Sequence, residues 1–172
     1  MGDAMAKGGK RRIDRILDPS FVDGISDASL ETLRAKREEC DEEESILSYE
    51  RSLIHSRLKI LKGELDRRAT GASPKSLIDR LPELLADPDV QHRGSFPKLD
   101  APALYENPKR RVEKLVANDT LARLPELSEE EINVATSALD EAEKEVSETR
   151  KRVHGALNQF IEEIGRRVGA DV

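Results

Sequence analysis

An internal repeat, in which Glu44 recurs as Glu143 at a separation of 99 residues, constrains the fold more than any other feature of this sequence. Residues 44–68 recur as residues 143–167 with the same amino acid at eight positions. The identical pairs are Glu44 and Glu143, Ser48 and Ser147, Arg51 and Arg150, His55 and His154, Leu58 and Leu157, Glu64 and Glu163, Arg67 and Arg166, and Arg68 and Arg167. The chain is therefore expected to build two equivalent elements.

Both copies lie on sequence that is typical of long helices. Apolar residues recur at alternating steps of three and four, which places them on one helix face as the seam of a coiled coil. The seam residues are Leu33, Cys40, Leu47, Ile54, Leu58, Leu61 and Leu65 in the first copy, and Ile132, Leu139, Val146, Val153, Leu157, Phe160 and Ile164 in the second. The two seams predict an all-α protein in which two long helices form an antiparallel coiled-coil hairpin.

Charged residues interrupt each seam near the middle of its helix. Midway along each helix, the heptad positions that alternate with these apolar residues are charged. They are Glu44 and Arg51 in the first helix and Glu143 and Arg150 in the second. In one interpretation these side chains reach water and only set the register of the helices. In the other, which the duplication favours, something polar binds between the helices. Without a ligand, these four charges are expected to pair with one another across the seam.

The composition limits the possible partners. Of the 172 residues, 37% are charged and only 3% are aromatic, which suits long amphipathic helices better than a large enzyme core. The net charge of -6 argues against direct nucleic-acid binding along the surface. The acidic clusters at residues 38–44 and 129–131 suit the starts of helices, and they also suit a basic partner.

The cysteine and histidine residues give no sign of catalysis. Cys40 is the single cysteine and lies on the apolar seam, so we expect a buried side chain and no disulfide. His55 and His154 have no residues placed beside them as metal ligands, and no nucleophile motif is present, so we expect no enzyme. The chain has no apolar run of the length of a signal peptide or membrane span, so we expect a cytoplasmic protein with no membrane association.

Capping and breaking residues divide the chain into four segments. Residues 1–26 are expected to form a tail, a short helix from Arg11 to Leu17, and an apolar patch that docks on the long helices or on a partner. Residues 27–69 form the first long helix, capped by Asp27 or Ser29. Residues 70–127 form a connector with short helices that begin near residues 74 and 108, and residues 128–172 contain the second long helix. That helix is predicted to start at the capping box of Ser128 and Glu131 and to end near residue 168.

The duplicated pattern, together with the segments RIDRILDP (12–19) and SLIDRLP (76–82), resembles the RsiG family of actinobacterial proteins over about residues 11–168. Members of that family are anti-sigma factors that sequester the WhiG sporulation sigma factor, a relative of the flagellar class. The resemblance implies that this chain is a monomer that forms a heterodimer with such a sigma factor.

In the RsiG family, each long helix carries Glu, Ser, Arg, Gln and Asp at fixed spacing, and a dimer of cyclic di-GMP lies between the helices. Carried over by position, the resemblance implies a ligand site in both copies. Its residues are Glu44, Ser48, Arg51, His55 and Lys59 in the first copy, and Glu143, Ser147, Arg150, His154 and Asn158 in the second. Histidine thus stands at both Gln positions, and Lys59 and Asn158 stand at the Asp positions.

The side chains of the intact positions suit a guanine dinucleotide. Arginine offers a bidentate fork to guanine O6 and N7, and a carboxylate accepts hydrogen bonds from N1 and N2. Lys59 cannot accept these bonds, although it can meet a phosphate, so we expect weaker cyclic di-GMP binding than the full pattern would give. The alternative function is that of a structural coiled-coil adaptor without a small-molecule ligand.

Overall fold

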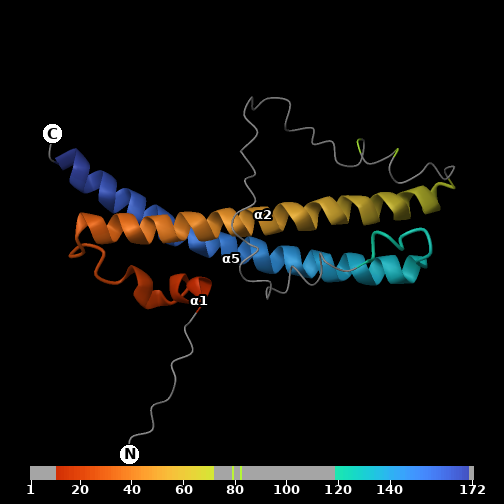
Figure 1. The fold of residues 1–172 in the computed structure, drawn as a ribbon, viewed down its shortest axis with the longest axis horizontal. Coiled ribbons are helices and arrows are strands. Elements are labelled where there is room, and N and C mark those ends of the chain that lie inside the picture. Colours follow the sequence, from red (N-terminus) through yellow and green to blue (C-terminus); the bar gives the residue numbers. More distant parts are fainter. Residues whose placement is uncertain (1–10, 72–78, 80–81, 83–118, 171–172) are drawn as a thin grey trace, which may run out of the picture. The chain divides into compact units, whose positions relative to one another are not determined.

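A computed structural model describes residues 11–71, 79, 82 and 119–170. The elements in order are the helix α1 (Arg12–Ile16), the 3-10 helix η1 (Pro19–Val22), and the long helices α2 (Leu30–Ala69) and α5 (Glu129–Ala170), as Figure 1 shows. The described residues include no strand, and the predicted all-α class is confirmed. The short helices expected in the connector lie outside the described residues, except for Asp79 and Pro82, which are both helical.

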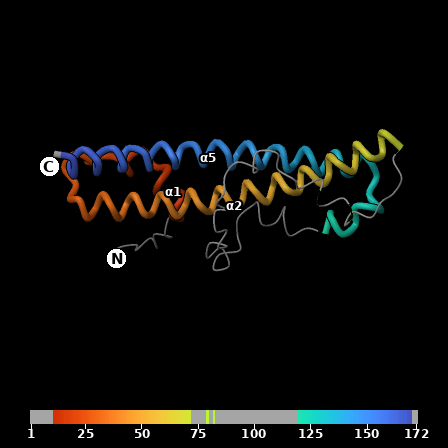
Figure 2. Tube along the Cα trace, turned by 90° about the horizontal axis from the view of Figure 1, so that it is seen from above, coloured from red at the N-terminus to blue at the C-terminus, as the bar shows by residue number. Residues whose placement is uncertain are grey.

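The chain divides into two compact units, each of which contains a section of both long helices. One unit comprises residues 46–148, and the other, called the terminal unit below, comprises residues 1–45 and 149–172. In the 46–148 unit, Arg68 at the end of α2 donates a hydrogen bond of 2.7 Å to the carbonyl oxygen of Leu127, just before α5 begins. In the terminal unit, Arg167 near the end of α5 donates one of 2.8 Å to the carbonyl oxygen of Ser26, before α2 begins. The helices are therefore antiparallel within each unit, as predicted (Figure 2).

The starts of both long helices follow the sequence signals. Ser29 Oγ accepts the backbone N–H of Thr32 at 3.1 Å, so Ser29 caps α2. Ser128 and Glu131 form the reciprocal capping box, in which each side chain accepts the backbone N–H of the other residue, at 2.7 and 3.1 Å.

The first long helix ends where the sequence predicts, and the second ends two residues later than predicted. The first helix ends at Ala69, and Gly71 follows with a φ of +63°, a left-handed conformation that glycine adopts without a steric penalty. Helix α5 passes through Gly155 and Gly165 as predicted, and it ends at Ala170, two residues beyond the expected end at Val168. A glycine inside a helix costs only about 1 kcal/mol, which is why Gly169 does not stop the last turn.

The predicted apolar seam forms the core of each unit. Every seam residue is buried except Leu65 and Ile164, which are half-buried. These two residues hold the same position in the repeat, at the end of each track. The fully buried members include Leu33, Cys40, Ile54, Leu61, Ile132, Val153 and Phe160.

Within the terminal unit, α1 and η1 pack against the long helices, which is one of the two alternatives expected for the apolar patch. The ring of Phe21 meets that of Phe160 edge to face, with centroids 5.7 Å apart. Arg12 Nε donates to the fully buried carboxylate of Glu43 at 2.9 Å, and Arg12 also pairs with Glu42. Arg15 pairs with Glu39. The acidic cluster at residues 38–44 therefore has a basic partner within the chain, which placement near a helix start alone does not explain.

An ionic clamp recurs at the end of each long helix. Glu64 accepts hydrogen bonds from Arg67 and Arg68 at 2.7 to 2.9 Å, and Glu163 accepts bonds of 2.6 to 2.9 Å from the two arginines at the repeated positions, Arg166 and Arg167. Hydrogen bonds from these arginines lower the pKa of both carboxyl groups to about 2. Arg68 and Arg167 also donate to backbone carbonyl groups, and the residues that supply these carbonyls are again 99 positions apart. The carbonyls are those of Leu124 and Leu127 for Arg68, and those of Ile25 and Ala28 for Arg167, which also bonds to Ser26.

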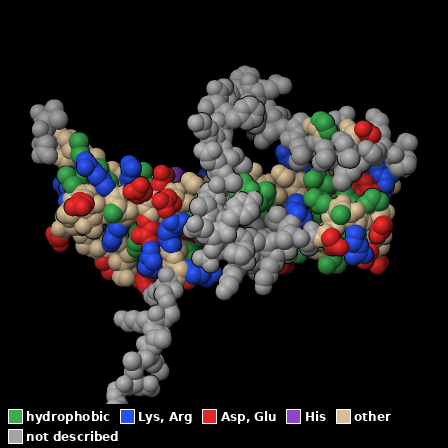
Figure 3. All heavy atoms as spheres, in the orientation of Figure 1, with side chains coloured by type: hydrophobic (Ala, Val, Ile, Leu, Met, Phe, Trp, Pro, Cys, Tyr) green, Lys and Arg blue, Asp and Glu red, His purple; other side chains and the backbone are tan. Residues whose placement is uncertain are grey.

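Ion pairs are spread over the surface. On the face drawn in Figure 3, acidic and basic side chains are interspersed along the helices. No helix in the described part of the chain combines the length and apolar character needed to cross a membrane.

The seam predicts which substitutions destabilise the protein. Leu157→Ala should lower the free energy of unfolding by about 2 to 5 kcal/mol, because Leu157 is only 6% exposed and its truncation leaves a cavity. Ile161→Ala, one turn later on α5, is the matched control because that side chain is 48% exposed. Thermal and urea unfolding followed by circular dichroism measure both. A larger loss for Ile161→Ala would mean that the helices pair through another face.

The clamps predict a dependence of stability on pH. The pKa of Glu64 and Glu163 is about 2 in the folded chain against an ordinary value of 4.5, so their contribution is complete above about pH 5 and is lost as the pH falls toward 2. Glu64→Gln should therefore destabilise the protein at pH 7 and have little effect near pH 2. The check is urea unfolding of both proteins across that range, and an effect that stays constant with pH would contradict the assignment.

Candidate functional site

Three motif residues of the 46–148 unit converge on one carboxylate oxygen of a fourth, Glu143. Glu143 Oε1 accepts hydrogen bonds from Ser147 Oγ at 2.7 Å and from Arg51 Nε at 2.9 Å, and it lies 3.2 Å from His55 Nε2. Arg51 Nε also lies 3.0 Å from Ser147 Oγ. Since Arg51 and His55 belong to α2 and the other two residues to α5, this group, called the Glu143 cluster below, links the two helices.

The environment of Glu143 keeps its carboxyl group ionised. The hydrogen bond from Ser147 lowers its pKa most, and those from Arg51 and His55 lower it further, while burial acts in the opposite direction. The net effect is a pKa below the ordinary value, so the carboxylate of Glu143 retains its negative charge at neutral pH.

The terminal unit contains the reciprocal ion pair. Arg150 Nε donates to Glu44 Oε1 at 2.7 Å. The arginine and glutamate side chains are 40% and 18% exposed, against 42% and 20% for Arg51 and Glu143, so the two pairs have similar environments. The arginine of each copy therefore meets the glutamate of the other copy, and the predicted pairing across the seam is confirmed.

The remaining motif positions differ between the copies. His55 contacts Glu143, whereas His154 is exposed and has no hydrogen-bond or ion-pair partner in the part of the chain that the structure describes. Lys59 is half-buried and Asn158 is exposed. Ser48, the counterpart of Ser147, is half-buried.

An open pocket of about 460 Å³ adjoins the Glu143 cluster. Its lining residues are His55, Leu58, Lys59, Lys62, Gly63, Asp66, Asp140 and Glu143. Lys62 Nζ pairs with Asp140 across the two helices at 3.0 Å. Sequence reasoning identified three of these residues, His55, Lys59 and Glu143, but missed Lys62, Asp66 and Asp140. A helical signal was available for Lys62 and Asp66, since they follow Lys59 by three and seven residues and share its helix face.

The cluster leaves hydrogen-bonding capacity for a ligand. Arg51 contacts Glu143 and Ser147 through Nε, and among the described residues its two terminal nitrogens have no acceptor. All three donors to Glu143 use Oε1, so Oε2 has no partner in the same part of the chain. The arrangement thus presents a guanidinium fork and a carboxylate oxygen, which can bind a group with both acceptors and donors.

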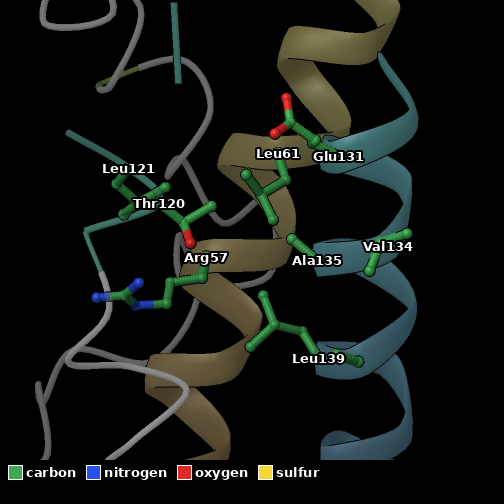
Figure 4. Close-up of a pocket in the computed structure, with 9 residues that line it drawn as sticks. Arg57, Leu61, Thr120, Leu121, Glu131, Val134, Ala135 and Leu139 are labelled. Carbon is green, nitrogen blue, oxygen red and sulfur yellow. The ribbon is translucent and has the colours of Figure 1, made fainter. Parts of the chain in front are cut away.

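A second cavity, of about 160 Å³, contains none of the motif residues. It is lined by Leu61 and Arg57 of α2, by Val134, Ala135, Ala138, Leu139 and Glu131 of α5, and by Thr120 and Leu121 of the segment before α5 (Figure 4). Burial lowers the pKa of the Arg57 guanidinium. The mainly apolar lining makes this cavity a poor candidate for a polar ligand.

The side chains with catalytic or metal-binding potential show no built site. Burial raises the pKa of the Cys40 thiol to about 11, which keeps it protonated and unreactive at neutral pH. Within residues 11–71 and 119–170, no group of three or more His, Cys, Asp or Glu side chains is placed to hold a metal ion.

Comparison with known protein families finds a match to the part of the chain that carries the first copy of the motif. The model of the RsiG-like family matches residues 19–85, a range that includes η1, the whole of α2 and the first motif copy. None of the curated proteins matches the chain. The matched segment supplies Arg51 and His55 of the Glu143 cluster and Glu44 of the reciprocal pair. The match over residues 19–85 supports membership of the RsiG-like family, and that family suggests an anti-sigma role.

Proposed function

We propose that this protein is an anti-sigma factor that sequesters a sigma factor of the WhiG or flagellar class, with cyclic di-GMP as its co-ligand. The observation that supports this proposal best is the reciprocal pairing of the duplicated motif, Arg51 with Glu143 and Arg150 with Glu44. A chain that only needed a coiled coil would gain more stability from apolar residues at these seam positions.

The geometry of the Glu143 cluster supports a guanine ligand. Among described residues, the terminal nitrogens of Arg51 and Oε2 of Glu143 have no partners, and they match the acceptors and donors on the edge of guanine. Ser147 holds both side chains in place through two hydrogen bonds. A guanine can therefore bind without breaking the contact between the helices, which we infer is the reason for the duplicated arginine and glutamate.

The same ion pairs imply that the protein depends only partly on its ligand. Arg51 and Arg150 link α2 to α5 through contacts between protein side chains alone. Each pair is partly exposed, so each contributes at most about 1 kcal/mol to stability, but the two together favour one register of the helices. We propose that this register is the one that binds the sigma factor.

The structural coiled-coil adaptor remains the second candidate function. One observation favours it: the motif charges pair with one another, and the apolar seam is sufficient to hold the helices together. An adaptor would show no stabilisation by cyclic di-GMP and no selective capture of a sigma factor. Both properties are measurable on the purified chain.

Arg51→Ala tests the ligand assignment. The substitution should weaken cyclic di-GMP binding by about 1 to 3 kcal/mol, the usual contribution of a bidentate arginine contact to guanine. Titration calorimetry measures the change, and Arg57→Ala is the matched control because Arg57 lies on the same helix and lines the other cavity. Unchanged affinity in Arg51→Ala would remove Arg51 from the binding site.

Co-purification with a WhiG-type sigma factor tests the function and its ligand dependence. The two proteins should form a complex under nucleotide-free conditions, because the Arg51 and Arg150 ion pairs already hold the helices in register. Added cyclic di-GMP should raise the affinity further. A complex that forms only with cyclic di-GMP would contradict partial independence, and no complex under either condition would contradict the anti-sigma role.

A further inference from the structure

The repeat extends to the segments that precede the two long helices. Before α2, the N–H of Asp27 donates to the carbonyl oxygen of Gly24 at 3.0 Å, and before α5 that of Glu126 donates to the carbonyl oxygen of Arg123 at 2.8 Å. The second pair lies 99 residues after the first, as do the carbonyl groups that the two clamps bind. The same backbone turn therefore precedes both helices, and residues at this separation occupy equivalent places in the two units.

In the terminal unit, two phenyl rings and a cation pack together beside this turn. Phe21 of η1 meets Phe160 of α5 edge to face, with ring centroids 5.7 Å apart, and Phe160 is fully buried. Lys36 Nζ of α2 lies 5.0 Å from the centroid of the Phe21 ring and 5.8 Å from that of Phe160. The terminal unit thus holds one ring from the preceding segment against a second ring and a cation.

In the 46–148 unit, the equivalent positions surround the cavity of about 160 Å³ (Figure 4). The counterparts of Phe21, Phe160 and Lys36 are Thr120, Leu61 and Ala135. All three counterparts line the cavity, and each is smaller than the residue at the equivalent position. Replacing large side chains by small ones leaves a cavity where the missing atoms stood. The cavity is therefore the place of an aromatic pair whose rings these positions do not supply.

The size and lining of the cavity suit an aromatic ring. A volume of about 160 Å³ is enough for one ring, since an engineered apolar cavity of about 150 Å³ binds benzene. Arg57 lines the cavity and stands where the other unit has Ala156, so it can supply the cation that Ala135 lacks. Val134, also in the lining, is 71% exposed, which indicates that the cavity reaches the surface.

The charge beside the cavity indicates the kind of partner. Glu131 is a lining residue, and it belongs to the exposed acidic cluster at residues 129–131. An aromatic side chain flanked by basic residues therefore suits both the cavity and its surroundings. A sigma factor binds DNA and carries basic surfaces for that purpose, so it is a partner of this chemistry.

We propose that this cavity is the docking site for an aromatic side chain of the sigma factor, which takes the place that Phe21 takes in the terminal unit. The identity of the partner rests on the proposed function, whereas the ring site rests on the cavity alone. Thr120 stands at the position from which the chain would supply the ring itself. The terminal unit thus binds its own N-terminal segment at this place, and the 46–148 unit binds the partner there.

Methyl NMR spectra of the full chain, titrated with benzene, test the ring site. Benzene should shift the methyl signals of the lining residues Leu61, Leu121, Val134 and Leu139. Thr120→Phe should weaken benzene binding by about tenfold or more, because the added ring fills the cavity. Ser137→Phe adds the same ring at an exposed position of α5 outside the lining, and it should change the binding by less than about twofold.

Two results of this titration would overturn the ring site. One is that benzene does not bind the wild-type chain. The other is that benzene binds only after Phe96→Ala or Tyr105→Ala, which would mean that an aromatic side chain of the connector already occupies the cavity.

Sigma-factor capture by the full chain tests the docking. Thr120→Phe and Ala135→Leu fill the cavity from opposite sides, and each should weaken capture by about tenfold or more, as expected for loss of a buried aromatic anchor. Ser137→Phe should capture the sigma factor as the wild-type chain does. Circular dichroism melting establishes that each variant is folded, and the second filling variant decides the result if the first does not fold.

The two measurements separate this inference from the proposed function. Capture that persists in both filling variants overturns the docking site and leaves the anti-sigma role intact. Benzene binding by a wild-type chain that captures no sigma factor overturns the anti-sigma role and the identity of the partner, and it retains the ring site.

Discussion

The apolar seam between antiparallel sections of α2 and α5 is the interaction on which the rest of the structure depends. Each large apolar side chain that is buried contributes about 1.5 to 3 kcal/mol, and the seam supplies several such residues in each unit. The partly exposed ion pairs of the motif contribute at most about 1 kcal/mol each. The seam therefore holds the helices together, and the motif charges are free to serve specificity and binding.

Charged residues determine which register of the seam is used. A uniform apolar seam can slip by a heptad, whereas each motif arginine finds its glutamate, Glu143 or Glu44, in one register only. The clamps at the helix ends act in the same direction, because Arg68 and Arg167 bind the carbonyl groups that precede the opposite helix. Side chains that add little stability thus define the geometry of the candidate site.

The two copies of the repeat have kept their common framework and differ in their surroundings. Glu43 of the first copy is fully buried beneath Arg12 of α1, and its counterpart in the second copy is Ala142. Lys59 and Asp66 likewise have the uncharged counterparts Asn158 and Gly165. A duplicated element can retain the residues that hold it together while each copy acquires its own contacts. In this chain Arg12 of α1 binds Glu43 beside the first copy, and Lys59 and Asp66 of the first copy line the pocket.

The sequence by itself determined the local features of this protein. The seam periodicity, the caps at Ser29 and Ser128, the stop before Gly71 and the pairing of the motif charges all depend on residues within one helix or on the repeat between the two helices. The sequence did not reveal that Arg12 and Arg15 pair with the acidic cluster. Nor did it reveal that Arg68 and Arg167 bind the segment that precedes the opposite helix. The pocket that Lys62, Asp66 and Asp140 line with Lys59 was also not evident from it. These features join residues far apart in the chain. Periodicity defines the face of a helix, but only the packed structure decides which distant side chain lies opposite each position on that face.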